Sequence, residues 1–429
     1  MRGKYFRYLF ESLDGELLHT GSIYDKEKQN MITYIYMVGS YCRNGAQSRS
    51  TKLFAQGDGI PEQIDLLVMG GYTVQDIIQL IGIVKHHRIK KVILPYLAPI
   101  QRLVLVEELK DKRVAEKEAI RFLQDPYCFL KEYQIGRIYF LYGNGALIDR
   151  EPEELEHGVH FERVDPKSLQ LVQEMEGYAV PVVRAGYIVE NGWLFYFGVY
   201  GLDIRIVSNF TRDYFSHMEN IDELSENIHE DYISHMKRLL SEYLSKFGSS
   251  PATTLAMYAG PLYANPEEND IFMTEKESVG EECRSLRVRC RGDDRCMCTV
   301  SCIYQKDYDM IRSQTEKDRW VSRFGIFMLG NVNLNRYLSE IAARFFRFRF
   351  RIRGVSVPNC GSGEDWNHKI LNLTPGNSRI YWICSKNDIT SVGVVSDIVL
   401  TKSNYRFLAV DETIGCCFSG YIIPKEDID

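Results

Sequence analysis

Apolar and polar positions along the first hundred residues follow two patterns, one typical of strands and one typical of a helix. Residues 4–10 and 31–38 mix aromatic and β-branched side chains between turn-forming clusters, which predicts strands. Residues 64–69 form the short apolar run that is typical of a fully buried strand. The apolar spacing of residues 74–84 predicts a helix, and residues 91–97 predict the next strand. This succession of strand, helix and strand is typical of an α/β fold.

The rest of the chain continues this alternation. A charged helix is predicted over residues 103–123, and the Gly-Asn-Gly turn at 143–145 predicts a hairpin. The other predicted elements are helices at 224–247 and 336–343 and strand-rich segments at 178–207, 253–258, 324–329, 379–384, 395–400 and 406–410. No internal repeat or low-complexity linker divides the sequence, so we predict one domain over residues 1–429, with an insertion at residues 262–323.

Composition narrows the class of protein. The chain has 429 residues, of which 45% are apolar and 26% charged, as expected of a globular protein with a substantial core. No apolar run reaches the ~18 residues of a membrane helix, and the N-terminus lacks the apolar block of a signal peptide. We therefore expect a soluble, cytoplasmic protein. Its net charge of −6 disfavours general binding of polyanions but leaves room for a local basic patch.

The predicted insertion is rich in cysteine. The chain has 11 cysteines, an odd number that indicates reduced thiols or metal ligands rather than a disulfide framework. Five of them lie between Cys283 and Cys302, and a tetrahedral structural zinc is one interpretation. Its ligands would be Cys290, Cys296, Cys298 and Cys302. The spacing lacks paired C-x2-C motifs, so a cysteine-rich β-hairpin is the alternative interpretation.

Residues 344–353 alternate arginine with apolar side chains. A period of two predicts a strand whose apolar face is opposed by an arginine face. The arginines of that face are Arg347, Arg349, Arg351 and Arg353. Guanidinium groups in such a row bind phosphates or carboxylates. In an acidic chain we favour an acidic surface of the same protein or of a protein partner, with nucleic acid as the alternative.

Two segments carry a family resemblance. Gly71, Thr73, Gln75 and Asp76 follow the buried strand at the positions of a zinc motif H-x-[HD]-x-D-H. Further on, Asn331 ends a Met-Leu-Gly-Asn segment, and residues 355–362 resemble a strand that ends in Pro-His-His-Gly-Ser. In this order the chain resembles the metallo-β-lactamase fold, particularly the hydrolase module of competence-type DNA-uptake proteins. The resemblance implies an αββα sandwich over roughly residues 30–410.

The zinc ligands of that family are replaced in this chain. Asn331 stands at the position of an aspartate, and Asn359 and Cys360 stand at the positions of the two histidines. Only Asp76 and Cys360 carry groups that bind metals well, so the resemblance implies a catalytically inactive member. For Asp76 the simpler interpretation is a carboxylate in the first turn of a helix, and for Cys360 a small buried side chain.

The resemblance therefore implies a binding or scaffolding subunit with a protein partner. Such a subunit would serve a bacterial multi-protein assembly, such as a defence or nucleic-acid-processing system. The rival hypothesis is a hydrolase of a phosphodiester or nucleotide with an atypical site. It would act through Asp76, Asn331, Asn359 and Cys360, through Cys360 with His368, or through a metal in the insertion.

Overall fold

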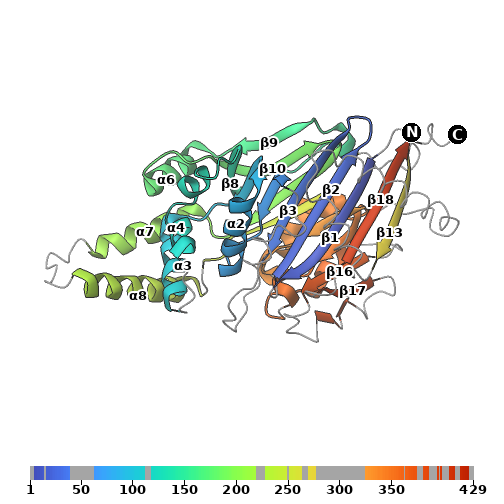
Figure 1. Ribbon diagram of the computed structural model, residues 1–429. Helices are drawn as coiled ribbons and strands as arrows, with labels where there is room; N and C mark the ends of the chain where they lie inside the picture. Colours follow the sequence, from blue (N-terminus) through green and yellow to red (C-terminus); the bar gives the residue numbers. More distant parts are fainter. Residues whose placement is uncertain are drawn as a thin grey trace.

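A large mixed sheet with helices around it forms the framework of the protein (Figure 1). The computed structural model describes residues 4–13, 16–38, 62–111, 117–218, 228–248, 251–262, 269–276, 324–361, 363–373, 380–385, 394–395, 397–398, 405–410 and 416–424. Helices and strands alternate within these ranges, so the predicted α/β class is confirmed. None of the helices in these ranges combines the length and the apolar character needed to cross a lipid bilayer.

The strands run from the N-terminus to the C-terminus of the chain. They are β1 (Lys4–Leu13), β2 (Glu16–Asp25), β3 (Asn30–Val38), β4 (Gln63–Ile64), β5 (Leu66–Met69), β6 (Arg88–Ile89), β7 (Lys91–Pro95), β8 (Arg137–Asn144), β9 (Gly158–Arg163), β10 (Val182–Glu190), β11 (Trp193–Tyr200), β12 (Thr254–Pro261), β13 (Asn269–Lys276), β14 (Gly325–Met328), β15 (Ile352–Ser356), β16 (Ile380–Ser385), β17 (Tyr405–Val410) and β18 (Cys416–Pro424).

The helices lie mostly in the central part of the chain. They are α2 (Val74–His86), α3 (Pro99–Asp111), α4 (Lys117–Gln124), α5 (Pro126–Lys131), α6 (Pro166–Glu176), α7 (Ile204–Met218), α8 (Ile228–Phe247) and α11 (Leu334–Phe345). Short 3₁₀ turns are η1 (Pro152–Glu154), η2 (Phe346–Phe348), η3 (Pro358–Gly361) and η4 (His368–Leu373).

The main sheet is folded back on itself. Its strand order is β13-β18-β1-β2-β3-β5-β7-β8-β10-β11-β12-β14-β15-β16-β17, and β9 pairs with β10. β1 contacts β16 and β17 across the fold, so the two halves of the path face each other. The apolar core between them includes Phe6, Phe195, Met257 and Ile383. The outer face of one half packs against α2 to α8, and that of the other packs against α11, η2 and η4.

Local sequence explains the entry into α2. The Thr73 side chain accepts a hydrogen bond from the Asp76 backbone N–H, and the Asp76 carboxylate accepts one from the Thr73 backbone N–H. This capping box satisfies N–H groups that the first helical turn leaves unpaired. The apolar positions of α2, including Ile77, Leu80 and Val84, are buried in the helix-covered core. The helix predicted over residues 74–84 is therefore confirmed.

Three predicted elements are wrong. Residues 143–148 form no hairpin, because β8 extends to Asn144 and pairs in parallel with β7 and β10. The single helix predicted over residues 103–123 is two helices, α3 and α4. Within the predicted strand 395–400, Val395, Asp397 and Ile398 are helical rather than extended, and Ile398 is fully buried.

The arginine strand predicted over residues 344–353 is also wrong. Arg344 and Phe345 end α11, η2 follows, and only Ile352 and Arg353 belong to a strand. The reason is tertiary packing: Phe345 and Phe348, three residues apart as in a helical turn, are both buried against Tyr196 of β11. A period of two would have sent them to opposite faces of a sheet.

The predicted insertion is only partly described. Its residues 269–276 form β13, which pairs antiparallel with β18 and belongs to the main sheet. Cys283, Cys290, Cys296, Cys298 and Cys302 lie outside the described residues. The structural zinc therefore stays a prediction.

Candidate functional site

Segments far apart in the sequence meet beyond the ends of β5, β14 and β15. Gly71 follows β5, Asn331 follows β14, and Asn359 follows β15. A Cβ atom at Gly71 would lie 3.4 Å from Asp76 Oδ2 and 3.9 Å from Asn331 Nδ2, and Asn359 Nδ2 lies 3.5 Å from the Asn331 carbonyl. Gly71, Asp76, Asn331 and Asn359 thus surround one point. Ligands bind beyond the carboxyl ends of parallel strands in open α/β sheets, so this rim is the candidate site.

The Asp76 carboxylate at this point is engaged within the chain. Asp76 is fully buried, and its Oδ2 accepts hydrogen bonds from the backbone N–H and the hydroxyl of Thr73, both at 2.8 Å. These bonds and the position in the first helical turn satisfy a negative charge without a metal ion. In the structure Thr73 is the N-cap of α2, which explains its polar side chain at this position.

The amides on the opposite side are held by Asp365. Its two carboxylate oxygens accept hydrogen bonds from the side chains of Asn333 and Asn359, and its carbonyl accepts one from Leu334 N–H at 2.9 Å. Burial raises the pKa of the Asp365 carboxyl, while the amide bonds oppose this shift. Asp365 therefore joins the loop after β15 to the first turn of α11.

A cleft of about 320 Å³ opens beside these groups. Its lining combines polar side chains from the loops after β14 and β15 with aromatic side chains from β11, α8 and α11. The lining side chains that matter most are Tyr200, Tyr243, Asn331, Arg336, Tyr337 and Asp365. A volume near 300 Å³ lies at the lower end of small-ligand sites, which combine apolar walls with a few polar groups.

The predicted site residues divide into two groups. Gly71, Asp76, Asn331 and Asn359 are brought together. Gln75 is not part of this group, and its buried Oε1 has no hydrogen-bond partner among the residues that the structure describes. Cys360 lies in η3, but the placement of its side chain is outside the described part. Among the residues that the structure describes, no three His, Cys, Asp or Glu side chains are close enough to hold a metal ion.

The predicted arginine set does not share one surface. Arg353 is only 6% exposed, and its guanidinium lies 5.3 Å from the centre of the Tyr381 ring. Arg351 donates to the Leu262 carbonyl. Arg347 lies in the η2 turn and Arg349 follows it, and both are half-exposed, as is Arg351. Contact of these arginines with a partner stays a prediction.

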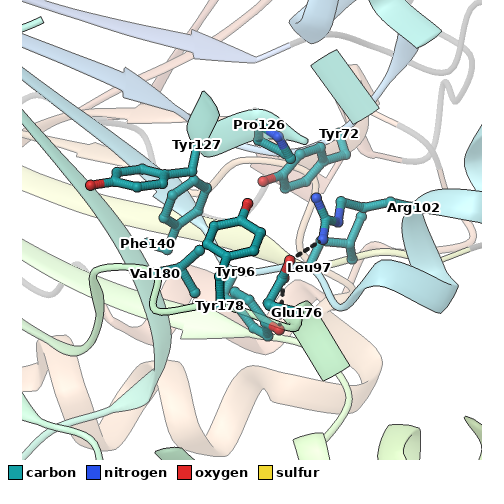
Figure 2. A pocket seen from close by; sticks show the side chains of 10 residues that line it. All are labelled: Tyr72, Tyr96, Leu97, Arg102, Pro126, Tyr127, Phe140, Glu176, Tyr178 and Val180. Atoms are coloured by element: carbon teal, nitrogen blue, oxygen red, sulfur yellow. Dashed lines mark hydrogen bonds and ion pairs between the residues drawn. The ribbon is translucent and has the colours of Figure 1, made fainter. Parts of the chain in front are cut away.

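A second polar cluster lies under the same rim, at the end of β7. Figure 2 shows Tyr72, Tyr96 and Tyr127 gathered near the buried pair of Arg102 and Glu176. Arg102 Nη2 lies 2.6 Å from Glu176 Oε2, and the Tyr96 hydroxyl donates to Glu176 Oε1 at 3.0 Å. Burial raises the pKa of Glu176, although Arg102 and Tyr96 oppose that shift.

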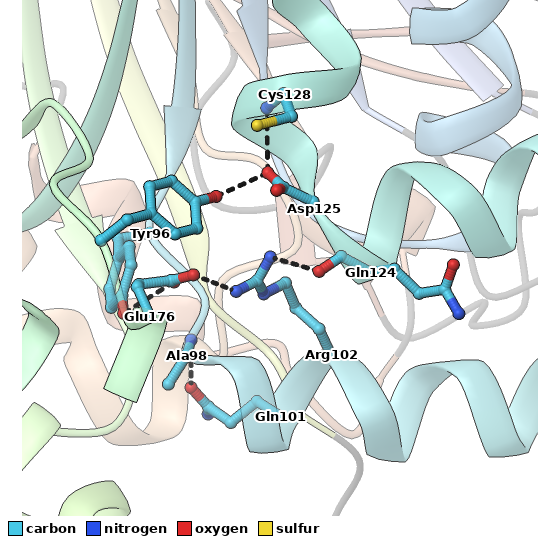
Figure 3. Close-up of polar contacts among 9 residues, drawn as sticks. Tyr96, Ala98, Gln101, Arg102, Gln124, Asp125, Cys128 and Glu176 are labelled. Carbon is cyan, nitrogen blue, oxygen red and sulfur yellow. Dashed lines mark hydrogen bonds and ion pairs between the residues drawn. The ribbon is translucent and has the colours of Figure 1, made fainter. Parts of the chain in front are cut away.

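This cluster fastens helices rather than enclosing a ligand. In Figure 3, Arg102 of α3 reaches both Glu176 of α6 and the Gln124 carbonyl of α4. The cavity beside them measures about 10 Å³, which is room for one water molecule at most. The neighbouring Gln101 donates to the hydroxyl of Tyr243, a residue of the cleft. The cluster therefore positions α3 and α8 behind the cleft wall.

We expect Glu176→Gln to destabilise the fold by about 2 kcal/mol. The amide keeps the shape of the side chain but leaves the buried Arg102 guanidinium without its counter-charge. Urea unfolding followed by circular dichroism measures the change. The matched control is Glu132→Gln, because Glu132 pairs with Arg121 on the surface and should contribute under about 1 kcal/mol. Equal losses in the two variants would contradict the positioning role of Glu176.

Two buried polar side chains have no counterpart among the sequence predictions. Arg344 donates to the carbonyls of Phe197, Ala185 and Gly145, and its guanidinium lies 4.5 Å from the centre of the Tyr196 ring. His19 is fully buried between the two halves of the sheet. The sequence signal for its burial is its spacing from Leu17 and Ile23. All three residues are separated by even numbers of positions along β2, so their side chains point to the same inner face.

Comparison of the chain with protein-family models, with curated proteins and with solved structures gives no match in any of the three.

Proposed function

We propose that this protein is a non-catalytic, metallo-β-lactamase-like subunit that serves as a binding or scaffolding component of a bacterial multi-protein assembly. The observation that supports this proposal most directly is that polar groups around Gly71 are hydrogen-bonded within the chain. Four positions of the family's metal site converge there, but Asp76 caps α2 and Asn359 is held by Asp365. These groups shape the rim of a cleft instead of presenting a set of metal ligands.

The arrangement of layers adds support. Two facing sheet halves carry helices on both outer sides, which is the αββα order of that family. Two of the positions compared with the family's metal ligands, Asn331 and Asn359, line the cleft, together with other polar and aromatic side chains. We infer that it recognises a polar ligand or a loop of a partner protein. A defence or nucleic-acid-processing system is the setting that the resemblance favours.

Restoring the family's ligands tests this proposal. We expect Gly71→His/Thr73→His/Asn331→Asp to gain about one equivalent of zinc over the wild-type protein, measured by elemental mass spectrometry after dialysis against zinc. A Cβ at Gly71 would make only an ordinary van der Waals contact, since its nearest neighbour would lie at 3.4 Å. Gly71→Ala/Thr73→Ala/Asn331→Ala is the control, since it changes the same positions without adding ligands. Absence of any gain in a folded variant would argue against the family assignment.

The rival function is a hydrolase that uses the same cleft. The observation that favours it is the cleft itself, whose lining includes the polar side chains of Asn331, Asn359 and Asp365. The rate at which the wild-type protein hydrolyses bis(p-nitrophenyl) phosphate distinguishes the hydrolase from the non-catalytic subunit. The non-catalytic subunit gives no activity above buffer. Activity that Asp76→Asn or Asn359→Ala abolishes would establish the hydrolase instead.

A further inference from the structure

An exposed turn after α11 presents two aromatic rings and a cation. Phe346 and Phe350 are each 50% exposed, whereas Phe348 between them is fully buried. The Arg349 guanidinium lies 3.6 Å from the centre of the Phe346 ring and 4.3 Å from that of Phe350. We call Phe346, Arg349 and Phe350 the Phe–Arg knob. Stacking between two rings and a bond to the Phe346 carbonyl hold the guanidinium outward in one orientation.

An acidic groove lies beside this knob. It measures about 320 Å³ and is lined by Leu147, Asp149, Arg150, Glu156, Glu162 and Tyr187, among others. Arg347, next to the knob, donates to the Arg150 carbonyl, so the knob and the groove are neighbours on one face. Leu147 is 55% exposed. The face thus combines exposed apolar side chains with charges of both signs.

The charges of this face are not neutralised within the part of the chain that the structure describes. Arg347 and Arg349 make no ion pair there, and neither do Asp149 and Glu156 of the groove. Exposed aromatic and arginine side chains are the residue types that dominate the binding energy of protein interfaces. A cationic knob beside an anionic groove therefore fits a partner surface that places an anionic groove opposite the knob and a cationic knob opposite the groove.

We propose that this face joins two copies of the chain across a two-fold axis, with the Phe–Arg knob of each copy in the acidic groove of the other. A two-fold interface uses the same patch twice, and this patch is complementary to itself in charge. A polyanion fits less well, because Asp149 and Glu156 would repel phosphates beside the knob and the chain carries a net charge of −6. The proposal does not depend on the function of the cleft.

Charge exchange between two variants tests the dimer. Sedimentation of the full-length protein over a roughly hundredfold concentration range should show wild-type species at twice the 49.7 kDa chain mass. Arg347→Glu/Arg349→Glu should raise the dimer dissociation constant by roughly thirtyfold or more, as should Asp149→Lys/Glu156→Lys. Mixing the two variants should restore a dimer, because each knob then faces a groove of opposite charge. Phe346→Ser/Phe350→Ser tests the apolar contact.

Matched controls keep the result specific. Phe215→Ser removes an aromatic side chain of similar exposure, 46%, from α7, outside this face, and should leave the dimer unchanged. A wild-type protein that stays monomeric throughout would overturn the proposal. So would two reversed variants that dimerise as the wild type does, or a mixture that stays monomeric. Binding of a monomeric wild-type protein to a labelled oligothymidylate, lost in Arg347→Glu/Arg349→Glu, would replace the second copy by a nucleic acid.

Discussion

Acidification from pH 6.5 to pH 3 is expected to weaken the folded state by roughly 4 kcal/mol through His19 alone. His19 Nδ1 donates to the Leu9 carbonyl at 3.2 Å, since a carbonyl can only accept, and Nε2 then accepts from the Tyr34 hydroxyl at 2.9 Å. The neutral ring is satisfied, whereas a charged ring would be fully buried beside Phe10. Burial lowers the pKa of His19 from 6.5 to about 3.

The sign of the effect follows from proton binding. Between these two pH values the unfolded chain takes up a proton at His19 and the folded chain does not, so stability is fully present above pH 6.5 and declines toward pH 3. Urea midpoints at several pH values measure the slope. His19→Gln supplies one donor and one acceptor in place of the two ring nitrogens but does not titrate. The difference in unfolding free energy between the two proteins should therefore change with pH by this amount. Parallel pH profiles would show that His19 is not the group responsible.

Arg344→Met is expected to cost about 4 kcal/mol of stability. The guanidinium donates to three carbonyls, of Phe197 at 2.5 Å, Ala185 at 2.8 Å and Gly145 at 3.0 Å, and so ties α11 to β10, β11 and the loop after β8. Methionine fills much of the space but donates nothing. Lysine keeps the charge but not the three-way geometry, and should recover less than half of the loss.

Two comparisons make this result specific to the buried arginine. Arg336 lies on the exposed side of the same helix, so Arg336→Met should change the free energy of unfolding by less than about 0.5 kcal/mol. Unfolding in guanidinium chloride at pH 7 measures all three variants. A loss at Arg344 no larger than that at Arg336 would mean that the three carbonyls are satisfied without the side chain.

Secondary structure was predicted correctly where the spacing of apolar residues fits only a helix or only a strand. In α2 the positions of Ile77, Leu80 and Val84 fit only a helix, and the buried run that became β5 fits only a strand at its length. Residues 344–353 alternate too, but their spacing also places Phe345 and Phe348 one 3₁₀ turn apart. Contacts with Tyr196 and Tyr258, far away in the sequence, decide between the two structures. Those contacts leave no local signal.

The candidate site was predictable in part for a similar reason. The resemblance indicated that the segments after three strands meet, and Gly71, Asn331 and Asn359 do lie together. The pair of Arg102 and Glu176 was not predictable, because its members are 74 positions apart and neither stands in a motif. The family assignment itself remains our proposal. Side chains that bind one another across long sequence separations are visible only in three dimensions.

The pairing of β1 with β18 has a consequence for how this chain is made. Lys4 lies opposite Ile422, so a strand from the start of the chain has its final neighbour near the end. β18 also lies between β1 and β13 in the sheet. Neither of these earlier strands can form its hydrogen bonds to β18 before β18 has been made. On the ribosome β1 therefore keeps an open hydrogen-bonding edge until residues 416–424 have been made. Such edges favour aggregation and slow folding, which makes the nascent chain, rather than the finished protein, the form most in need of a chaperone.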